Sequence, residues 1–322
     1  IGQHNHQLWL LTVRDGERLI GIAPLMLNTR KKSFFRYRKL ENIGNPDCDV
    51  SGIVSLEPEK TARVILTYLL DRGSEWDILE IRELPQDCQG TQLLLAAIRE
   101  NNLRLVETNE KHFYIPLTGT WEQYYNRLSK NLKHNLKRRR RRAEEMGAIK
   151  VERYSGQNLR WEHFLRIFKL NEKSNFPDLY QSEQNQSFHK DLFNLMQAHD
   201  WIQIEILFIN EKPVAFQYGF TYDGKYEDWR GGIDKEYEFI APGKLLMMLT
   251  MEKRFESEFE ESDFLRGNHA YKTDWNPLKR DFLGIQVFNK KSLKARLAFA
   301  WIEYIKPHLN KRPPITHNET AE

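Results

Sequence analysis

The sequence predicts an α/β protein whose mixed sheet is mostly antiparallel and is built in two tandem halves. Two observations carry this prediction. Alternating apolar strands flank an Asp-Gly turn twice, at Asp15-Gly16 and at Asp223-Gly224, which is a strong signal for a β-hairpin. In each half a third strand, at about 37–43 and at 225–233, leads to a helix that starts at a proline and then to another strand, which is the order of a βαβ unit with flanking helices.

The first half alternates short strands with two helices. The proline at the start of its first helix and the glycine after it are typical helix boundaries. The expected elements are strands at 8–13, 18–27, about 37–43 and 52–56, a helix from Pro58 to Gly73, a strand at 76–81, a helix at 87–101 and a strand at 103–107.

The second half repeats that order, although the two halves share little sequence. We infer the duplication from the order of elements alone. The expected elements are strands at 112–117, 202–208, 214–222 and 225–233, a helix from Pro242, strands at 263–267 and 282–288, and a helix from 292 to about 305.

Length and composition fit two globular domains. The chain has 322 residues, 40% of them hydrophobic and 12% aromatic, so it can bury a core of ordinary size. We expect a first domain at 1–110, a second at 111–306 and a disordered tail at 307–322. The chain starts with Ile1 rather than Met, so we expect an upstream segment to be missing.

Charge and cysteine usage narrow the function classes. The net charge is only +4, which gives no reason to expect DNA binding. Cys48 and Cys88 form neither a metal motif nor a disulfide framework, so we expect no metal and a cytoplasmic location. No run approaches the ~18 apolar residues of a membrane span.

The helix that starts at Pro242 is a candidate anion site. Its first N–H groups, on Gly243, Lys244 and Leu245, would point out of the helix end toward a phosphate. Six of the seven residues at 245–251 are apolar, so this end of the helix should be buried and rigid. An ordinary Pro-Gly helix start is the open alternative.

A basic helix lies between the halves. Thr120 and Gln123 form a capping box, and an apolar stripe runs from Trp121 toward Gly147. The five arginines Arg138–Arg142 must surround the helix, so Arg139 should point inward toward a carboxylate or phosphate. The other arginines fit a solvated face, a nucleic-acid contact, an anionic cofactor or a peripheral contact with membrane lipid.

With these pieces placed, the second half resembles the GNAT acyltransferase superfamily, and most closely the branch called cellulose-biosynthesis acetyltransferases. It is also similar in its tandem architecture to the Fem-type aminoacyltransferases. The matching segments lie between about 112 and 290 and are Trp121 with 128–131 and the arginine run, 212–215, 232–234, 241–246, 263–267 and Tyr271-Lys272.

The resemblance implies acyl transfer from a thioester, typically acetyl-CoA or another acyl-CoA, to an amine or hydroxyl. Strands 225–233 and 263–267 would part, pantetheine would lie between them, and the pyrophosphate would sit at Gly243. The superfamily's longer glycine-spaced phosphate loop is here reduced to Pro242-Gly243-Lys244, so a donor other than CoA stays open.

The chemistry needs a base, a polarised carbonyl and an acid. We expect Asp228, on the same strand face as Arg230, to be the base. Backbone N–H groups near Trp229, Gly231 and Gly232 would polarise the carbonyl. The superfamily often keeps a phenol where Tyr271 stands, which implies a general acid.

Further residues are candidates for binding the substrates. Lys272 would hold a phosphate or a carboxylate, and His269 is a second candidate base. Asp47 and Asp49 of the first half would bind the acceptor, although turn formation explains them equally well. The residues expected to bind the cofactor are Trp229, Gly231, Gly232, Pro242, Gly243, Lys244 and Leu245. The residues expected to bind the substrate are Asp47, Asp49, Arg139, Arg230, His269 and Lys272.

Three functions follow as hypotheses. The first is a GNAT-type N- or O-acyltransferase of exopolysaccharide or envelope metabolism, with a small-molecule, saccharide or peptide acceptor. The second is a Fem-like transferase that uses aminoacyl-tRNA, which the arginine run would favour. The third is a non-catalytic module that binds an anionic ligand.

Overall fold

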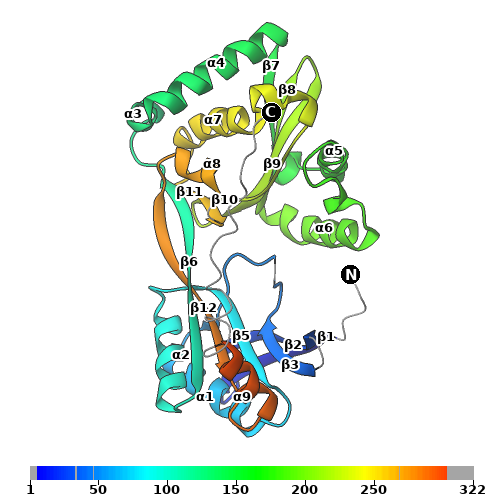
Figure 1. Ribbon diagram of the computed structural model, residues 1–322. Coiled ribbons are helices and arrows are strands. Elements are labelled where there is room, and N and C mark those ends of the chain that lie inside the picture. The colour runs from blue at the N-terminus through cyan, green and yellow to red at the C-terminus, as the bar shows by residue number, and fades with distance from the viewer. Residues whose placement is uncertain (1–5, 33–34, 46, 268, 303–322) are drawn as a thin grey trace, which may run out of the picture. The chain divides into compact units, whose positions relative to one another are not determined.

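The computed structural model describes residues 6–32, 35–45, 47–267 and 269–302. These divide into two compact units (Figure 1). Unit 1 holds the described residues up to Glu110 and from Asp281 on, and unit 2 is Lys111–Arg280. The chain passes from one unit to the other inside strands β6 (Arg104–Pro116) and β12 (Leu278–Phe288).

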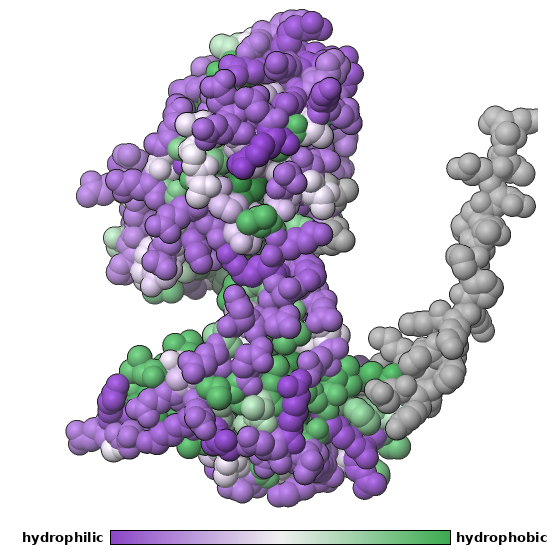
Figure 2. Space-filling model, turned by 90° about the vertical axis from the view of Figure 1, so that its left-hand side faces the viewer, coloured by the Kyte–Doolittle hydropathy of each residue, from purple (hydrophilic) through white to green (hydrophobic). Residues whose placement is uncertain are grey.

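Hydrophilic residues cover most of the surface visible in Figure 2. Among the described residues, no helix combines the length and the apolar character needed to cross a membrane.

Unit 1 is a mostly antiparallel sheet with two helices against one face. The strand order is β1 (His6–Asp15), β2 (Arg18–Lys32), β3 (Phe35–Asn42), β5 (Ile78–Pro85) and β12, and the short β4 (Val54–Ser55) pairs with β2. The predicted hairpin at Asp15-Gly16 is confirmed, since β1 and β2 pair antiparallel up to Asp15 and Arg18. Helices α1 (Pro58–Asp71) and α2 (Gln89–Glu100) pack their buried residues on the core of this sheet.

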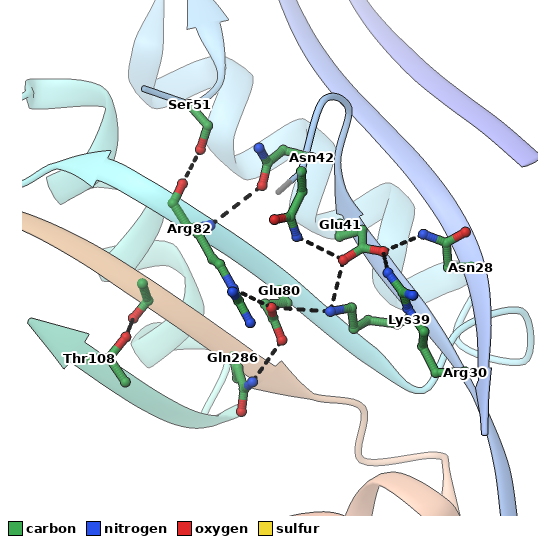
Figure 3. A network of polar contacts seen from close by, with 12 residues as sticks. Asn28, Arg30, Lys39, Glu41, Asn42, Ser51, Glu80, Arg82, Thr108 and Gln286 are labelled. Atoms are coloured by element: carbon green, nitrogen blue, oxygen red, sulfur yellow. Dashed lines mark hydrogen bonds and ion pairs between the residues drawn. The ribbon is translucent and has the colours of Figure 1, made fainter. Parts of the chain in front are cut away.

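The other face of the unit 1 sheet carries a line of charges of alternating sign (Figure 3). Lys39 Nζ lies 2.8 Å from Glu41 Oε2 and 3.1 Å from Glu80 Oε1. Arg30 binds Glu41 and Arg82 binds Glu80 at the two ends. Burial opposes ionisation of Glu41. The charge of Lys39 and the hydrogen bonds that Glu41 accepts outweigh this effect and lower the pKa of Glu41.

Unit 2 repeats the plan of unit 1. The strand order is β6, β11 (Glu261–Arg266), β10 (Lys225–Ile233), β9 (Lys212–Tyr222), β8 (Ile202–Ile209) and β7 (Ile149–Ser155). The predicted hairpin at Asp223-Gly224 joins β9 to β10 and is confirmed. The two halves share an antiparallel strand pair, β1 with β2 and β8 with β9, followed by a parallel pair, β3 with β5 and β10 with β11.

Helices cover both faces of the unit 2 sheet (Figure 1). Every residue of β8 is buried, as expected for a strand covered on both faces. Its alternate residues Leu207 and Ile209 pack with α4 (Lys130–Met146) and α7 (Pro242–Phe255). On the opposite face, Ile202, Ile204, Ile206 and Phe208 pack with α5 (Trp161–Asn171) and α6 (Glu183–Met196).

Two predictions about the region between the halves were wrong. The strands expected at 103–107 and 112–117 are one strand, β6. The single basic helix is two helices, α3 (Trp121–Arg127) and α4, because Leu128 is extended and Ser129 caps α4 by accepting a hydrogen bond from the Leu132 N–H. The capping box of Thr120 and Gln123 is present as predicted.

The segment after Arg280 joins unit 1, whereas the sequence placed residues up to 306 in the second domain. The reason is packing: β12 pairs antiparallel with β5, and Leu283, Ile285 and Val287 enter the core beneath α1 and α2. Helix α9 (Leu293–Ala300) follows β12. The predicted tail at 307–322 lies outside the described residues.

Candidate active site

The two strands expected to part do so. β10 pairs in parallel with β11 only at three positions, the last being Glu227 with Asp263. Its antiparallel pairing with β9 continues to Ile233. Beyond Glu227 the edge of β10 that faced β11 has no strand partner in the described part of unit 2.

A β-bulge follows at Trp229. Asp228 lies opposite Gly219 of β9, whereas Arg230 lies opposite the adjacent Tyr218. Directly opposite residues share a face, so Asp228 and Arg230 point to opposite faces of the sheet. The prediction that they share a face was wrong because the bulge inserts one residue. The Arg230 guanidinium lies instead over the Trp229 ring, 4.5 Å from its centroid.

A cavity of about 390 Å³ opens where β10 leaves β11, and its lining includes residues from both faces. Eight of the predicted residues line it: Asp228, Trp229, Arg230, Gly231, Gly232, Gly243, Lys244 and Tyr271. Pro242 and Leu245 are buried behind it. The segment at 174–176 and the side chains of Phe216, Gln217 and Met247 complete most of the wall, and the sequence did not single these out.

The start of α7 offers one amide rather than three. Pro242 is the first helical residue, as predicted, and Ala241 before it is in the left-handed region with φ of 45°. The N–H groups of Lys244 and Leu245 both donate to the Ala241 carbonyl, at 3.0 and 3.2 Å. Of the three predicted donors, Gly243 alone makes no backbone hydrogen bond through its N–H. The expectation of a three-amide cradle was therefore wrong.

Gly243 is closely packed, and Lys244 is anchored beside it. A Cβ at Gly243 would lie 3.3 Å from Ile233 Cγ2, which leaves little room for a larger residue. Lys244 Nζ lies 2.5 Å from Asp274 Oδ2 of the short helix α8 (Ala270–Asp274). The ammonium is thus held at the rim of the cavity beside the helix start.

Asp228 has the properties of a base that works near neutral pH. Its pKa is raised to about 6: burial is the main cause and the charge of Glu205 adds to it, whereas Arg254, Lys272 and a hydrogen bond from Gln217 limit the rise. Gln217 Nε2 donates to Asp228 Oδ2 at 3.2 Å. A base is most effective when its pKa lies close to the working pH.

Tyr271 lines the same cavity from α8. Tyr271 is 40% exposed, but partial desolvation of the phenol raises its pKa, and the charge of Asp228 raises it further. The phenol is therefore protonated and able to act as an acid. His269 stacks against Tyr271 with ring centroids 6.0 Å apart, but it is exposed and does not line the cavity.

Lys272 faces inward rather than toward a ligand. It is 4% exposed, and its Nζ donates to the carbonyl oxygens of Phe264 at 2.6 Å, Leu265 at 3.4 Å and Arg266. An ammonium has three hydrogens, and these three contacts engage them. Lys272 therefore holds the end of β11, and its charge acts on Asp228 from there.

Arg139 is half-buried, whereas Arg138 and Arg140 to Arg142 are exposed. Its lower exposure agrees with the predicted inward orientation, and its pairing with a carboxylate or phosphate stays a prediction. Burial and the neighbouring Arg138 lower the pKa of Arg139, and Asp274 opposes them. The Asp274 carboxylate, which acts on Arg139, is also the one that binds Lys244.

Asp47 and Asp49 lie in a turn of unit 1. The Asp47 N–H donates to the Gly44 carbonyl at 2.7 Å, and Asp47 is exposed. Their predicted contact with the acceptor stays a prediction. Among the described residues no group of three or more His, Cys, Asp or Glu side chains is arranged to hold a metal.

Gln217 is a cavity-lining side chain in contact with Asp228 that the sequence analysis did not single out. In the alternating strand β9 it occupies one of the polar positions, which read as the solvent side. Helix α7 covers that side, so Gln217 is buried at 5% exposure. A polar residue flanked by small ones, Ala215 and Gly219, was the available signal.

Comparisons with known proteins agree with this geometry. Residues 130–273, all in unit 2, match the family model described as acetyltransferase (GNAT) domain. No curated protein matches the chain by sequence.

Solved structures share the fold across most of the chain at very low identity. L-PGS from Bacillus licheniformis has a TM-score of 0.54 at 10% identity and covers 95% of this chain and 90% of its own. FemX has a TM-score of 0.53 at 10% identity, with 86% and 88% covered. A tandem GNAT protein from the clavulanic acid biosynthesis pathway has a TM-score of 0.50 at 13% identity, with 89% and 84% covered.

Identities this low show the fold alone. Residues 130–273 are thus similar in sequence to the GNAT acetyltransferase domain, and the fold of the chain is similar to those of a tandem GNAT protein and FemX.

Proposed function

We propose that unit 2 transfers an acyl group, acetyl in the simplest case, from an acyl-CoA to an amine or hydroxyl acceptor. The observation that carries this proposal is the position of Asp228. It is the first residue of β10 beyond the pairing with β11, it lines the cavity at that point, and its pKa is about 6.

The residues at the start of α7 fit an anionic donor. The Gly243 N–H and the dipole of α7 favour a negative charge at the cavity rim, and the Lys244 ammonium, which is paired with Asp274, lies beside them. The edge of β10 beyond Glu227 offers backbone N–H groups that could donate to the acyl oxygen as it gains negative charge. Anion binding at the start of α7 and at the edge of β10 would therefore not require a phosphate loop with several glycines.

In the proposed reaction Asp228 accepts the proton of the attacking amine or hydroxyl. The acceptor nitrogen or oxygen forms a bond to the acyl carbon, and the bond from that carbon to sulfur breaks. Tyr271 gives its phenolic proton to the departing thiolate. Solvent then carries the proton from Asp228 back to Tyr271, so one proton moves from acceptor to thiol overall.

Calorimetric titration with acetyl-CoA tests donor binding. We expect saturable heat with the wild type and its loss in Gly243→Val, because the new side chain would meet Ile233 and cover the helix start. Gly90→Val is the matched control: Gly90 also occupies the second position of its helix, α2, and its nearest contacts are 3.8 Å or more away. Absence of heat with every CoA thioester would end the proposal.

One observation favours a second donor. Arg138 and Arg140 to Arg142 expose four guanidinium groups on α4, which fits the backbone of a tRNA. Aminoacyl-tRNA as donor predicts binding that weakens steeply as salt rises. If charged tRNA gives no gel shift at low salt, aminoacyl-tRNA is excluded as the donor. A gel shift that persists when all four arginines are replaced by Gln would exclude it as well.

The acceptor and the setting belong to the proposal as well. We place the reaction in the cytoplasm and in exopolysaccharide or envelope metabolism, near the cellulose-biosynthesis branch of the superfamily. The exposed arginines of α4 would allow contact with an anionic membrane surface. Product analysis with amino sugars, hydroxylated saccharides and peptides, each mixed with acetyl-CoA, would identify the acceptor.

A further inference from the structure

Two polar side chains and two glycines form a small rectangle on neighbouring strands. Asp228 of β10 lies opposite Gly219 of β9, and Gln217 of β9 lies opposite Gly231 of β10. Each polar residue therefore has a glycine as its direct partner across the ladder. With no side chain at Gly231, Gln217 reaches diagonally toward Asp228, and its Nε2 donates to Oδ2 at 3.2 Å.

Thr250 of α7 closes this arrangement from behind. Its Oγ1 donates to Gln217 Oε1 at 3.0 Å and lies 3.2 Å from the Met247 carbonyl oxygen. Gln217 is 5% exposed and Thr250 is 1% exposed. The two ends of an amide have nearly the same shape, so its partners decide its orientation. A donor at Oε1 leaves the NH₂ end facing the carboxylate.

The charges around Asp228 are held by other bonds. Arg254 is bound by Glu205 and lies over the Tyr226 ring, with 3.6 Å between Cζ and the centroid. Lys272 is bonded to carbonyls of β11. Among these groups, Gln217 is the one whose hydrogen bond to the Asp228 carboxylate is direct.

We propose that Gln217 is a positioning residue for Asp228, and that Thr250 determines which end of the Gln217 amide faces the carboxylate. Through Oδ2, Gln217 stabilises the ionised form and fixes the orientation of the group, which leaves Oδ1 to accept the proton of the acceptor. This inference rests on the proposed role of Asp228 as the base, and Gln217 itself exchanges no proton.

Three variants separate the two roles. Gln217→Met keeps a side chain of similar length and removes the donor, while the Thr250 hydroxyl keeps the Met247 carbonyl as its acceptor. Thr250→Val removes the hydroxyl at nearly constant volume and frees the amide to turn. Thr250→Ser keeps the hydroxyl and serves as the conservative rescue.

The pKa of Asp228 is the quantity to measure, by infrared difference spectra of its protonated carboxyl with Asp228→Asn as the spectral blank. We expect Gln217→Met to raise the pKa by about one, since a hydrogen bond to a charged group of roughly 1.5 kcal/mol corresponds to about that change. Thr250→Val should raise it by less, and Thr250→Ser should match the wild type. If the pKa of Asp228 is unchanged in folded Gln217→Met, the proposed role of Gln217 is wrong. If it is unchanged in Thr250→Val, the proposed role of Thr250 is wrong.

This readout does not require turnover. If the pKa moves as expected but no acyl-CoA is consumed with any acceptor, the positioning role stands and the proposed function fails. If transfer is observed, the acid limb of the kcat/KM profile should move with the spectroscopic pKa. Transfer with an acid limb that stays in place in Gln217→Met would refute the inference and leave the acyltransferase intact.

Discussion

Asn42 and Asp228 occupy equivalent positions in the two parallel strand pairs. β3 pairs with β5 at three positions ending at Glu41, and β10 pairs with β11 at three positions ending at Glu227. The next residue is Asn42 in unit 1 and Asp228 in unit 2. Asn42 lines a cavity of about 320 Å³ in unit 1, as Asp228 lines that of unit 2.

An amide cannot take up a proton as a carboxylate does, so we expect the chemistry to be confined to unit 2. Asp228→Asn, which makes the two positions alike, should lower kcat/KM by about 10²-fold or more. Asn42→Ala should leave it within a few-fold of the wild type. Thiol release from acetyl-CoA is the measurement, with circular dichroism to confirm folding. Equal losses in both variants would contradict a single active unit.

The pH dependence of the rate should follow Asp228. The base must be ionised, and its pKa is about 6. We therefore expect kcat/KM to be constant above about pH 7 and to fall tenfold for each pH unit well below 6. Burial raises the pKa of Tyr271 above its usual value, so no loss from ionisation of this phenol should occur below about pH 10. A profile with an acid limb centred near 4 would refute the assignment of the base.

Tyr271→Phe should lower kcat by about 10²-fold while KM for acyl-CoA stays within a few-fold, because the hydroxyl is needed only when the thiolate leaves. An acyl donor with a more acidic leaving thiol should recover much of the rate, since it needs less proton transfer. His269→Ala is the neighbouring control, because its ring stacks on Tyr271 from outside the cavity. An equal loss in both variants would mean that packing, not the phenol, is responsible.

Lys272→Met should act on stability. It would leave the carbonyls of Phe264, Leu265 and Arg266 without their shared donor, which is expected to cost about 3 kcal/mol or more of unfolding free energy. Urea denaturation measures this, with Lys212→Met at an exposed site of β9 as control. A variant of wild-type stability that has instead lost affinity for acyl-CoA would restore the ligand role expected from the sequence.

The sequence predicted the main elements of the sheet and the place of the site because those signals are local. Asp-Gly turns fix hairpins, and proline marks the start of α1 and α7. The parting of β10 and β11 was also expected, although only from the resemblance to a family. Segments 148–201 were not assigned, and they contain β7, α5 and α6.

The errors arose where one residue changes the geometry of its neighbours. The bulge at Trp229 reversed the face of Arg230, and alternation cannot locate such an insertion. Ser129 divided the basic helix because a single hydroxyl capped a new start. Lys272 was misjudged because its carbonyl partners are exposed only by the irregular end of β11, where Leu265 has φ of 57°.

The pairing of β12 with β5 has a consequence for biosynthesis. As the chain leaves the ribosome, all of unit 2 emerges before the strand that unit 1 needs at the edge of β5. We therefore expect unit 2 to acquire its fold first, while the residues of unit 1 up to Glu110 remain with an unpaired strand and an incomplete core. A fragment that stops at Glu110 should accordingly aggregate, whereas one spanning Lys111–Arg280 contains a complete core.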